Sequence, residues 1–207
     1  MSDPLNERLN QILPKVISDA FLSGAGIGNE TPFYIFDYPP GDELRVRDYL
    51  RTLLEHIPKQ KHGLRVKHID LFDFVLDYLK GRNLLDKTIQ MQRVEGDEKL
   101  KKALAGPLNV KEKLTPYFSQ VVQPNQQDLV ILSGVGGVYP LLRTSTLLSN
   151  LQSVMGRTPL VVFYPGKYDQ VTLRLFGKLR LSAFFEGEGK GTGKKSENYY
   201  RAFKLIT

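Results

Sequence analysis

The residues with the clearest potential for chemistry lie in a glycine-bearing loop, Ser133–Tyr139, that follows a short apolar run. A dinucleotide-binding fingerprint would need a glycine where Tyr139 stands, and the loop has no lysine for a triphosphate. A second loop ends in Gly193-Lys194, but Glu188 and Lys195 occupy the positions where a P-loop needs glycine and a hydroxyl residue. We therefore interpret the first loop as a backbone turn, with a protein contact or a small ligand as alternatives, and the second as a flexible loop.

Ser133 is the one serine whose position after a strand invites a test for nucleophilic catalysis. A nucleophile elbow has the pattern G-x-S-x-G, but Ile131 and Val135 stand where the framing glycines should be. No histidine follows Ser133 in the sequence, so an esterase-type triad is not expected. We predict no catalytic residue and a protein that is not an enzyme.

The spacing of histidines and carboxylates also argues against a bound metal or cofactor. The three histidines are six residues apart, which does not place two imidazoles on one helix face: His56, His62 and His68. Asp70, Asp73 and Asp77 do share a helix face, where they could hold a hard cation or stabilise the helix N-terminus. We favour the structural role and expect neither a metal nor a cofactor.

Ten residues, several of them at or just beyond predicted strand ends, are candidates for contact with a partner. They are Asp37, Tyr38, Gly134, Gly136, Gly137, Tyr139, Arg143, Tyr164, Asp169 and Arg174. Asp37 with Arg143, or Asp169 with Arg174, would be ordinary structural ion pairs. Tyrosine and arginine gathered in one shallow patch would instead suit a hot spot for protein binding.

Composition places the chain among ordinary globular proteins, and we expect one domain over residues 1–207. It has 207 residues, 41% hydrophobic residues, no cysteine and a net charge of +7. No run reaches the roughly 18 apolar residues of a membrane span. The polar start does not resemble a signal peptide, so we expect a cytoplasmic protein without membrane contact. Eight basic and three acidic residues lie between positions 174 and 204, which could form a solvated surface or contact nucleic acid.

The apolar pattern predicts strands separated by helices. Strands are expected at Phe33–Asp37, Leu64–Ile69, Leu129–Leu132, Pro159–Tyr164 and Ala202–Ile206. Helices are expected at Leu5–Leu22 with a break at Pro14, after Asp42 with Leu44 inward, after Asp70 as its cap, at Glu98–Ala105 and Lys111–Val122, from Pro140 to Met155, and at Val171–Leu179. Glycines alternate with charged or polar residues within 182–198, which predicts a flexible basic loop.

The expected fold class is α/β, with a mainly parallel sheet of about five strands flanked by helices, because parallel strands need helical crossovers. A buried first strand followed by a Pro-Gly loop and a helix is also similar to nucleotide-hydrolase or Rossmann-like cores. By that analogy the core would be a degenerate P-loop-NTPase-like one that has lost its lysine.

Several ordered sequence blocks closely resemble the BrxB family of BREX (bacteriophage exclusion) phage-defence systems. The blocks are FYIFDYPPGDEL, VKHIDLFDFVL, SGVGGVYPLLRTSTLLSNLQ, VVFYPGKYD, LRLFGKL and NYYRAFKLI. The resemblance implies a component needed for phage exclusion, without a settled enzymatic activity, that works beside other BREX proteins and first of all PglZ. We therefore expect a protein–protein adaptor. The alternatives are a nucleic-acid-binding module that uses the basic C-terminal region, with weak contact to nucleic acid, and a degenerate nucleotide-binding protein.

Overall fold

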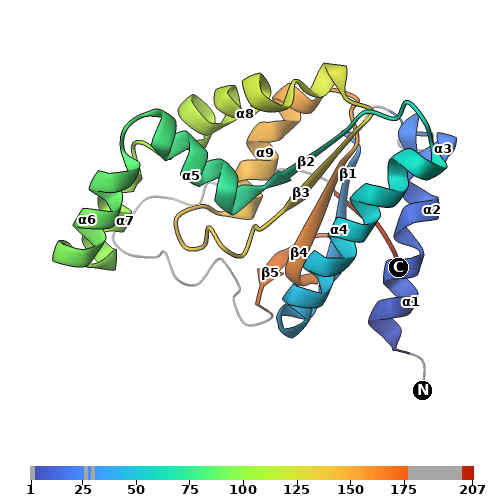
Figure 1. Ribbon diagram of the computed structural model, residues 1–207, viewed down its shortest axis with the longest axis horizontal. Helices are drawn as coiled ribbons and strands as arrows, with labels where there is room; N and C mark the ends of the chain where they lie inside the picture. The colour runs from blue at the N-terminus through green and yellow to red at the C-terminus, as the bar shows by residue number, and fades with distance from the viewer. Residues whose placement is uncertain (1–2, 26–27, 29–30, 177–201) are drawn as a thin grey trace, which may run out of the picture.

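The computed structural model describes residues 3–25, 28, 31–176 and 202–207, and its centre is a mainly parallel sheet flanked by helices (Figure 1). The six strands are β1 Phe33–Tyr38, β2 Val66–Asp70, β3 Leu129–Ser133, β4 Leu160–Tyr168, β5 Leu173–Leu175 and β6 Phe203–Lys204. Their order is β2-β3-β4-β1-β6, all parallel, and β5 pairs with β4 in antiparallel fashion. The predicted fold class is confirmed.

Helices cover both faces of this sheet. They are α1 Pro4–Asn10, α2 Ile12–Val16, α3 Asp19–Leu22, α4 Glu43–Gln60, α5 Leu71–Gly81, α6 Leu85–Glu95, α7 Asp97–Leu104, α8 Thr115–Val122 and α9 Thr144–Met155, with short 3-10 turns at Pro40–Asp42 and Pro124–Gln126 and a π-helical turn at Val110–Leu114. Helices α1 to α4 pack on one face through a core that includes Phe36, Leu53 and Phe163. Helices α5, α8 and α9 pack on the other through Leu71, Phe118 and Leu147.

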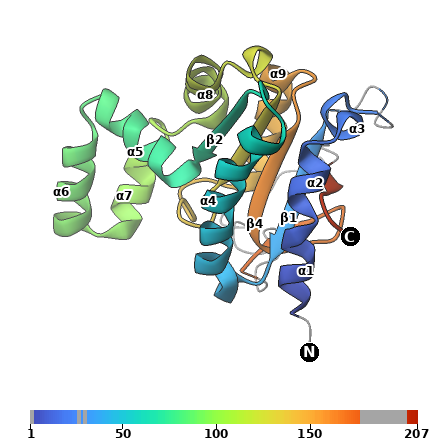
Figure 2. The ribbon, with the colours of Figure 1, turned by 45° about the vertical axis from the view of Figure 1, so that its right-hand side comes forward.

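The helices α6 and α7 form a hairpin that extends away from the sheet, beyond the end of α5 (Figure 2). No residue of α6 is buried, and in α7 only Leu104 is. Within the described part of the chain, no helix has both the length and the apolar character needed to cross a bilayer.

The predicted N-terminal helix is divided into three. It is interrupted at Gln11, three residues before Pro14, where the break was expected. A proline inside a helix cannot donate to the carbonyl four residues earlier and its ring clashes with that carbonyl. The interruption at Gln11 places Pro14 in the first turn of α2, where neither penalty arises. A second break follows at Ser18, whose side chain accepts the N–H of Phe21 as the cap of α3.

Three other local predictions were wrong. Residues 173–175 form β5, not a helix, because β4 continues past Pro165-Gly166 and returns through a turn at Asp169–Thr172. The helix predicted from Pro140 begins only at Thr144, because residues 134–143 form a turned loop anchored by buried Val135, Val138 and Leu142. Leu44 points outward. The glycine-rich stretch 182–198 and most of the basic C-terminal region lie outside the described residues.

The C-terminal segment completes the edge of the sheet next to β1. Strand β6 pairs with Tyr34 and Ile35, and the N–H of Leu205 donates to the carbonyl of Ile35 at 2.9 Å. The hydroxyl of Tyr168, at the end of β4, donates to the carbonyl of Ala202 at 2.7 Å. Residues 202–206 are therefore held by two strands that precede them by many residues.

Candidate functional site

The carboxyl ends of the parallel strands meet at one edge of the sheet, which we call the carboxyl rim: residues 37–45, 70–73, 133–143 and 165–176. The helix after β1 covers one face of the sheet, whereas the helices after β2 and β3 cover the other. In open α/β sheets, ligands bind at the carboxyl edge where the connections divide in this way. The predicted contact residues lie on this rim or in the strand ends beneath it.

The glycine loop, Ser133–Tyr139, packs against other parts of the same protein. Gly134 has φ +69°, and a side-chain carbon there would lie 2.6 Å from the carboxyl carbon of Asp70. Asp70 caps α5, since its Oδ1 accepts the N–H groups of Phe72 and Asp73 at 2.9 and 3.4 Å. The absence of a side chain at Gly134 therefore lets the loop backbone lie against the carboxylate of Asp70. This agrees with the interpretation of the glycine loop as a backbone turn.

The other glycines of this loop contact the two structures on either side. Gly136 lies against Pro165 and Phe176, and Gly137 lies against the side chain of Phe72. Tyr139 packs edge-on against Phe176, with ring centroids 6.2 Å apart. The loop thus bridges the start of α5 and the β4–β5 hairpin, and joins them into one continuous surface.

Asp37 joins four segments of the chain through one buried carboxylate. Its Oδ1 accepts from Arg8 of α1 at 2.8 Å, and its Oδ2 accepts the backbone N–H of Tyr168 at 2.9 Å. Lys204 of β6 lies 4.0 Å away. Asp37 therefore ties α1, β1, β4 and β6 together, and its role is structural.

Tyr38 is equally enclosed. Its hydroxyl donates to Oε2 of Glu43, the first residue of α4, at 2.6 Å. Burial, and then this hydrogen bond, raises the pKa of the Tyr38 phenol. The bond fixes the start of α4 over the end of β1.

Asp169 and Arg174 form the ion pair that the sequence suggested, 3.1 Å apart. Asp169 also accepts the N–H and hydroxyl of Thr172, both at 2.7 Å, and the N–H of Val171 at 3.1 Å. These hydrogen bonds, those from Thr172 first, lower the pKa of Asp169 to about 2. The carboxylate therefore organises the turn of the β4–β5 hairpin.

Tyr164 and Arg143 complete the ten predicted residues. Tyr164 is fully buried on the face covered by α5, α8 and α9, whereas Tyr38 belongs to the core under α4. Arg143 precedes α9 as its N-cap residue and is half-buried. The contacts described above thus place most of the predicted residues in turns, cores and internal pairs.

A set of three hydrogen-bonded polar residues at the rim was not predicted from the sequence. The Oγ of Ser133 lies 2.8 Å from Nε2 of His68 and 3.5 Å from Oδ2 of Asp70. The sequence signal was the spacing of His68 and Asp70, two residues apart and so on one face of β2, together with a serine at the end of β3. The register pairs Asp70 with Ser133.

The order of these three groups differs from that of a catalytic triad. In a triad, the acid bonds the histidine nitrogen that faces away from the serine and fixes the ring. Here the carboxylate bonds Ser133 and the N-terminal N–H groups of α5. The arrangement is a hydrogen-bond chain that connects β2, β3 and α5.

Stability should depend on the protonation of His68. Burial lowers the pKa of His68 below the usual 6.5, although Asp70 and Asp73 oppose this shift. The unfolded chain therefore takes up the proton first, so this contribution to stability is complete above pH 6.5 and is lost as pH falls below it. We expect the melting temperature of the wild type to fall more between pH 7 and pH 5 than that of His68→Gln, because glutamine does not titrate.

The matched control is His62→Gln, because His62 is exposed. It should keep the wild-type pH dependence of the melting temperature. Equal slopes for His68→Gln and the wild type would contradict the assignment.

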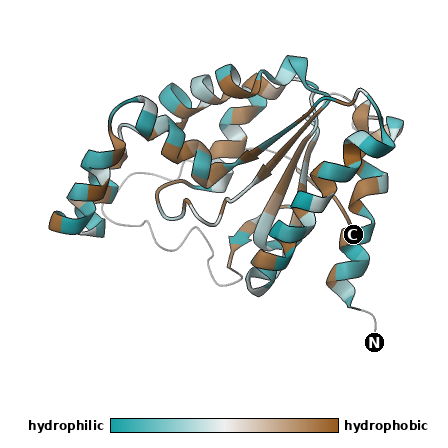
Figure 3. Cartoon of the chain, in the orientation of Figure 1, coloured by the Kyte–Doolittle hydropathy of each residue, from teal (hydrophilic) through white to brown (hydrophobic). Residues whose placement is uncertain are grey.

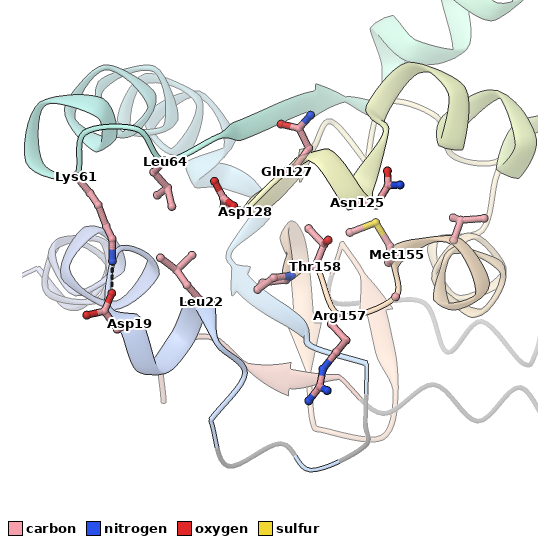
Figure 4. A pocket seen from close by; sticks show the side chains of 13 residues that line it. Asp19, Leu22, Lys61, Leu64, Asn125, Gln127, Asp128, Met155, Arg157 and Thr158 are labelled. Atoms are coloured by element: carbon pink, nitrogen blue, oxygen red, sulfur yellow. Dashed lines mark hydrogen bonds and ion pairs between the residues drawn. The ribbon is translucent and has the colours of Figure 1, made fainter.

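A cavity of about 570 Å³ lies at the opposite, amino edge of the sheet (Figure 4). Lys61 lies at one side of it, where its ammonium group pairs with Asp19 and also donates to the carbonyl of Ile17 at 2.8 Å. Asp128 accepts from the guanidinium of Arg65 at 2.7 Å. These charged groups are engaged within the chain: one pair connects α3 with the end of α4, and the other connects the residues just before β2 and β3. Among the described residues, no three His, Asp or Glu side chains gather as metal ligands would.

Comparisons with known proteins agree along almost the whole chain. A family model described as "BREX protein BrxB" matches residues 67–205. A BREX protein BrxB of Escherichia coli O9:H4 (strain HS) is 41% identical over 207 residues, which is 100% of this chain and 94% of the relative. One from Bacillus cereus (strain H3081.97) is 37% identical over 205 residues, 98% of this chain and 97% of the relative. No solved structure gave a significant match.

Proposed function

This chain belongs to the BrxB family of BREX proteins, and from that premise we propose that it is a non-catalytic adaptor of the phage-defence system. It binds another BREX component through its carboxyl rim, and PglZ is the first candidate. Membership of a multi-protein system supports a protein partner, but the proposal of a surface rests on the geometry of the rim.

The observation that carries the proposal is a set of exposed apolar side chains around the rim. Four of them are between 40% and 82% exposed: Leu44, Phe72, Val171 and Phe176. Phe72 and Phe176 are linked through the glycine loop, which contacts both. Exposed apolar groups along one edge of a protein mark interaction surfaces, and aromatic residues are enriched at the centres of interfaces.

The polar groups of the rim support the same role. Asp37, Tyr38, Asp70 and Asp169 each bond to groups of their own chain. These bonds fix the loops and helix starts that carry the apolar side chains. A surface held in place beforehand loses less conformational freedom on binding, which favours affinity.

Binding to purified BREX components tests this proposal. The double variant Leu44→Asp, Phe176→Asp should weaken binding to the partner at least about tenfold, which is about 1.4 kcal/mol. Its matched control is Val94→Asp, Val121→Asp, because these valines are also exposed and lie on α6 and α8, outside the rim. The control should bind as the wild type does.

Two outcomes would contradict the proposal in different ways. If PglZ and every other BREX component elute separately from the wild-type protein at mild salt, the adaptor role is wrong. If a component binds and the rim variant retains full affinity, the role stands and the surface is wrong.

A further inference from the structure

An apolar groove of about 240 Å³ lies between α5, the α6–α7 hairpin and the glycine loop. Leu76 of α5, Ile89 of α6, Leu100 of α7 and Leu141 of the loop are among its walls. Phe72 and Gly137 belong to both the groove and the carboxyl rim. The groove is thus a direct continuation of the surface proposed to bind a partner.

The hairpin has little apolar packing of its own. Ile89 is 42% exposed, and α6 contributes no buried residue to the protein. Short helices in proteins depend mainly on packing of an apolar face for their stability. Figure 3 shows apolar positions on both helices of the hairpin, which stands away from the main core. A partner seated in the groove would supply the missing contacts.

The size and walls of the groove indicate which kind of partner fits. Its volume is below the roughly 300–1,000 Å³ of sites for small molecules, so it suits one or two large apolar side chains. Helices form most of its walls, as in proteins that bind an amphipathic helix through apolar residues spaced by three or four positions.

The charge around the groove indicates which polar residues a bound helix would carry beside its apolar ones. The segment from Lys80 to Lys113, which contains the hairpin, has nine Lys or Arg and five Asp or Glu. One of the acids, Glu95, is already paired with Lys99 at 2.9 Å. On the α5 side, the charge of Asp73 acts on His68 of β2. Within the hairpin itself, residues 85–104, the count is five basic to four acidic, so most of the positive excess lies in the residues that flank it. Acidic residues on the partner would complement those flanks.

We propose that the groove binds an amphipathic helix of the BREX component held by the carboxyl rim, with large apolar anchors and acidic residues beside them. This inference rests on the proposed adaptor function. The groove would add a second contact at one end of the rim, and the hairpin would then have a role in partner binding.

Single-cysteine labelling tests the site directly, because the chain contains no cysteine. The probe is the BREX component that co-purifies with the wild type. An environment-sensitive dye on Thr88→Cys, inside the groove, should shift to the blue when that component is added. The same dye on Val94→Cys, on α6 but outside the groove lining, should not shift.

Affinity gives an independent measure. Ile89→Gln should weaken binding about tenfold, whereas Val94→Gln, the same kind of change on the same helix, should leave it within about twofold. Arg93→Glu should also weaken binding and should reduce its dependence on salt. Circular dichroism confirms that each variant is helical.

The outcomes separate this inference from the adaptor proposal. If no component binds the wild type, the adaptor proposal fails and the groove proposal with it. If a component binds but Ile89→Gln has wild-type affinity and the Thr88→Cys dye does not shift, the groove proposal alone is overturned. A blue shift on self-association without any partner would assign the groove to a second copy of this chain and would also overturn it.

Discussion

Asp37→Ala is expected to lower the free energy of unfolding by about 3 kcal/mol. The carboxylate is buried, and its removal leaves the guanidinium of Arg8 and the N–H of Tyr168 without their acceptor. The Tyr168 N–H is buried and cannot readily reach water, whereas the Arg8 side chain is 27% exposed and can be partly solvated, so most of the loss comes from the buried N–H. Urea denaturation with an unchanged m-value would measure the loss.

Two further variants show whether this effect comes from the bonds of Asp37. Asp37→Asn keeps an oxygen for the Tyr168 N–H and should be less destabilising than alanine. Asp48→Ala removes a carboxylate that pairs with Arg51 on the exposed side of α4, and it should change stability little. An Asp37→Ala protein as stable as Asp48→Ala would contradict the structural role of Asp37.

Gly134→Ala is expected to destabilise the protein by a similar amount, about 3 kcal/mol. A residue with a side chain costs about 1–2 kcal/mol at positive φ, and crowding in a packed region adds about 1–3 kcal/mol. The crowding arises because the new carbon would lie within the carboxyl group of Asp70, which itself caps α5. The loop or the cap must therefore move.

A double-mutant cycle identifies the contact responsible. Asp70→Ala alone should cost about 1 kcal/mol as the loss of a helix cap. The double variant Gly134→Ala, Asp70→Ala should be less destabilised than the sum of the two, because the clash is removed. Gly41→Ala, on the same rim, has no neighbour within 4 Å and should be nearly neutral. Strict additivity in the cycle would show that the contact is not the cause.

The parts of the fold that were predicted from sequence depend on local patterns. The continuous apolar runs of β1, β3 and β4 indicate strands buried on both faces, and the spacing of apolar residues in α4 and α5 indicates helices. Asp70 was correctly identified as a cap because the capping bond reaches only two or three residues along the chain.

The parts that could not be predicted depend on which segments become neighbours. Arg8 and Tyr168 meet at Asp37 from 29 and 131 residues away, and no local pattern specifies either. Ser133 and His68 were each considered for chemistry, but their contact follows from the pairing of β2 with β3, which periodicity does not determine. Leu44 was placed in the core, but it lies two positions before Val46 and so faces away from the buried stripe of α4, which is formed by Val46, Leu50, Leu53 and Ile57.

The same limit explains the errors at the rim. The residues 173–175 have too few positions to distinguish a strand from a helix, and their pairing with β4 decides the matter. The exposed aromatic surface was also missed, because exposure of Phe72 and Phe176 depends on where the glycine loop lies.

The position of β6 beside β1 has a consequence for biosynthesis. A ribosome makes Tyr38 165 residues before Phe203, which corresponds to about 10–30 s of translation. During that interval the outer edge of β1 lacks its β6 neighbour, and its sequence, FYIFDY, is aromatic and able to aggregate. The nascent chain therefore carries an unpaired strand edge until β6 has been synthesised, and a chaperone that shields this edge would raise the yield of native protein.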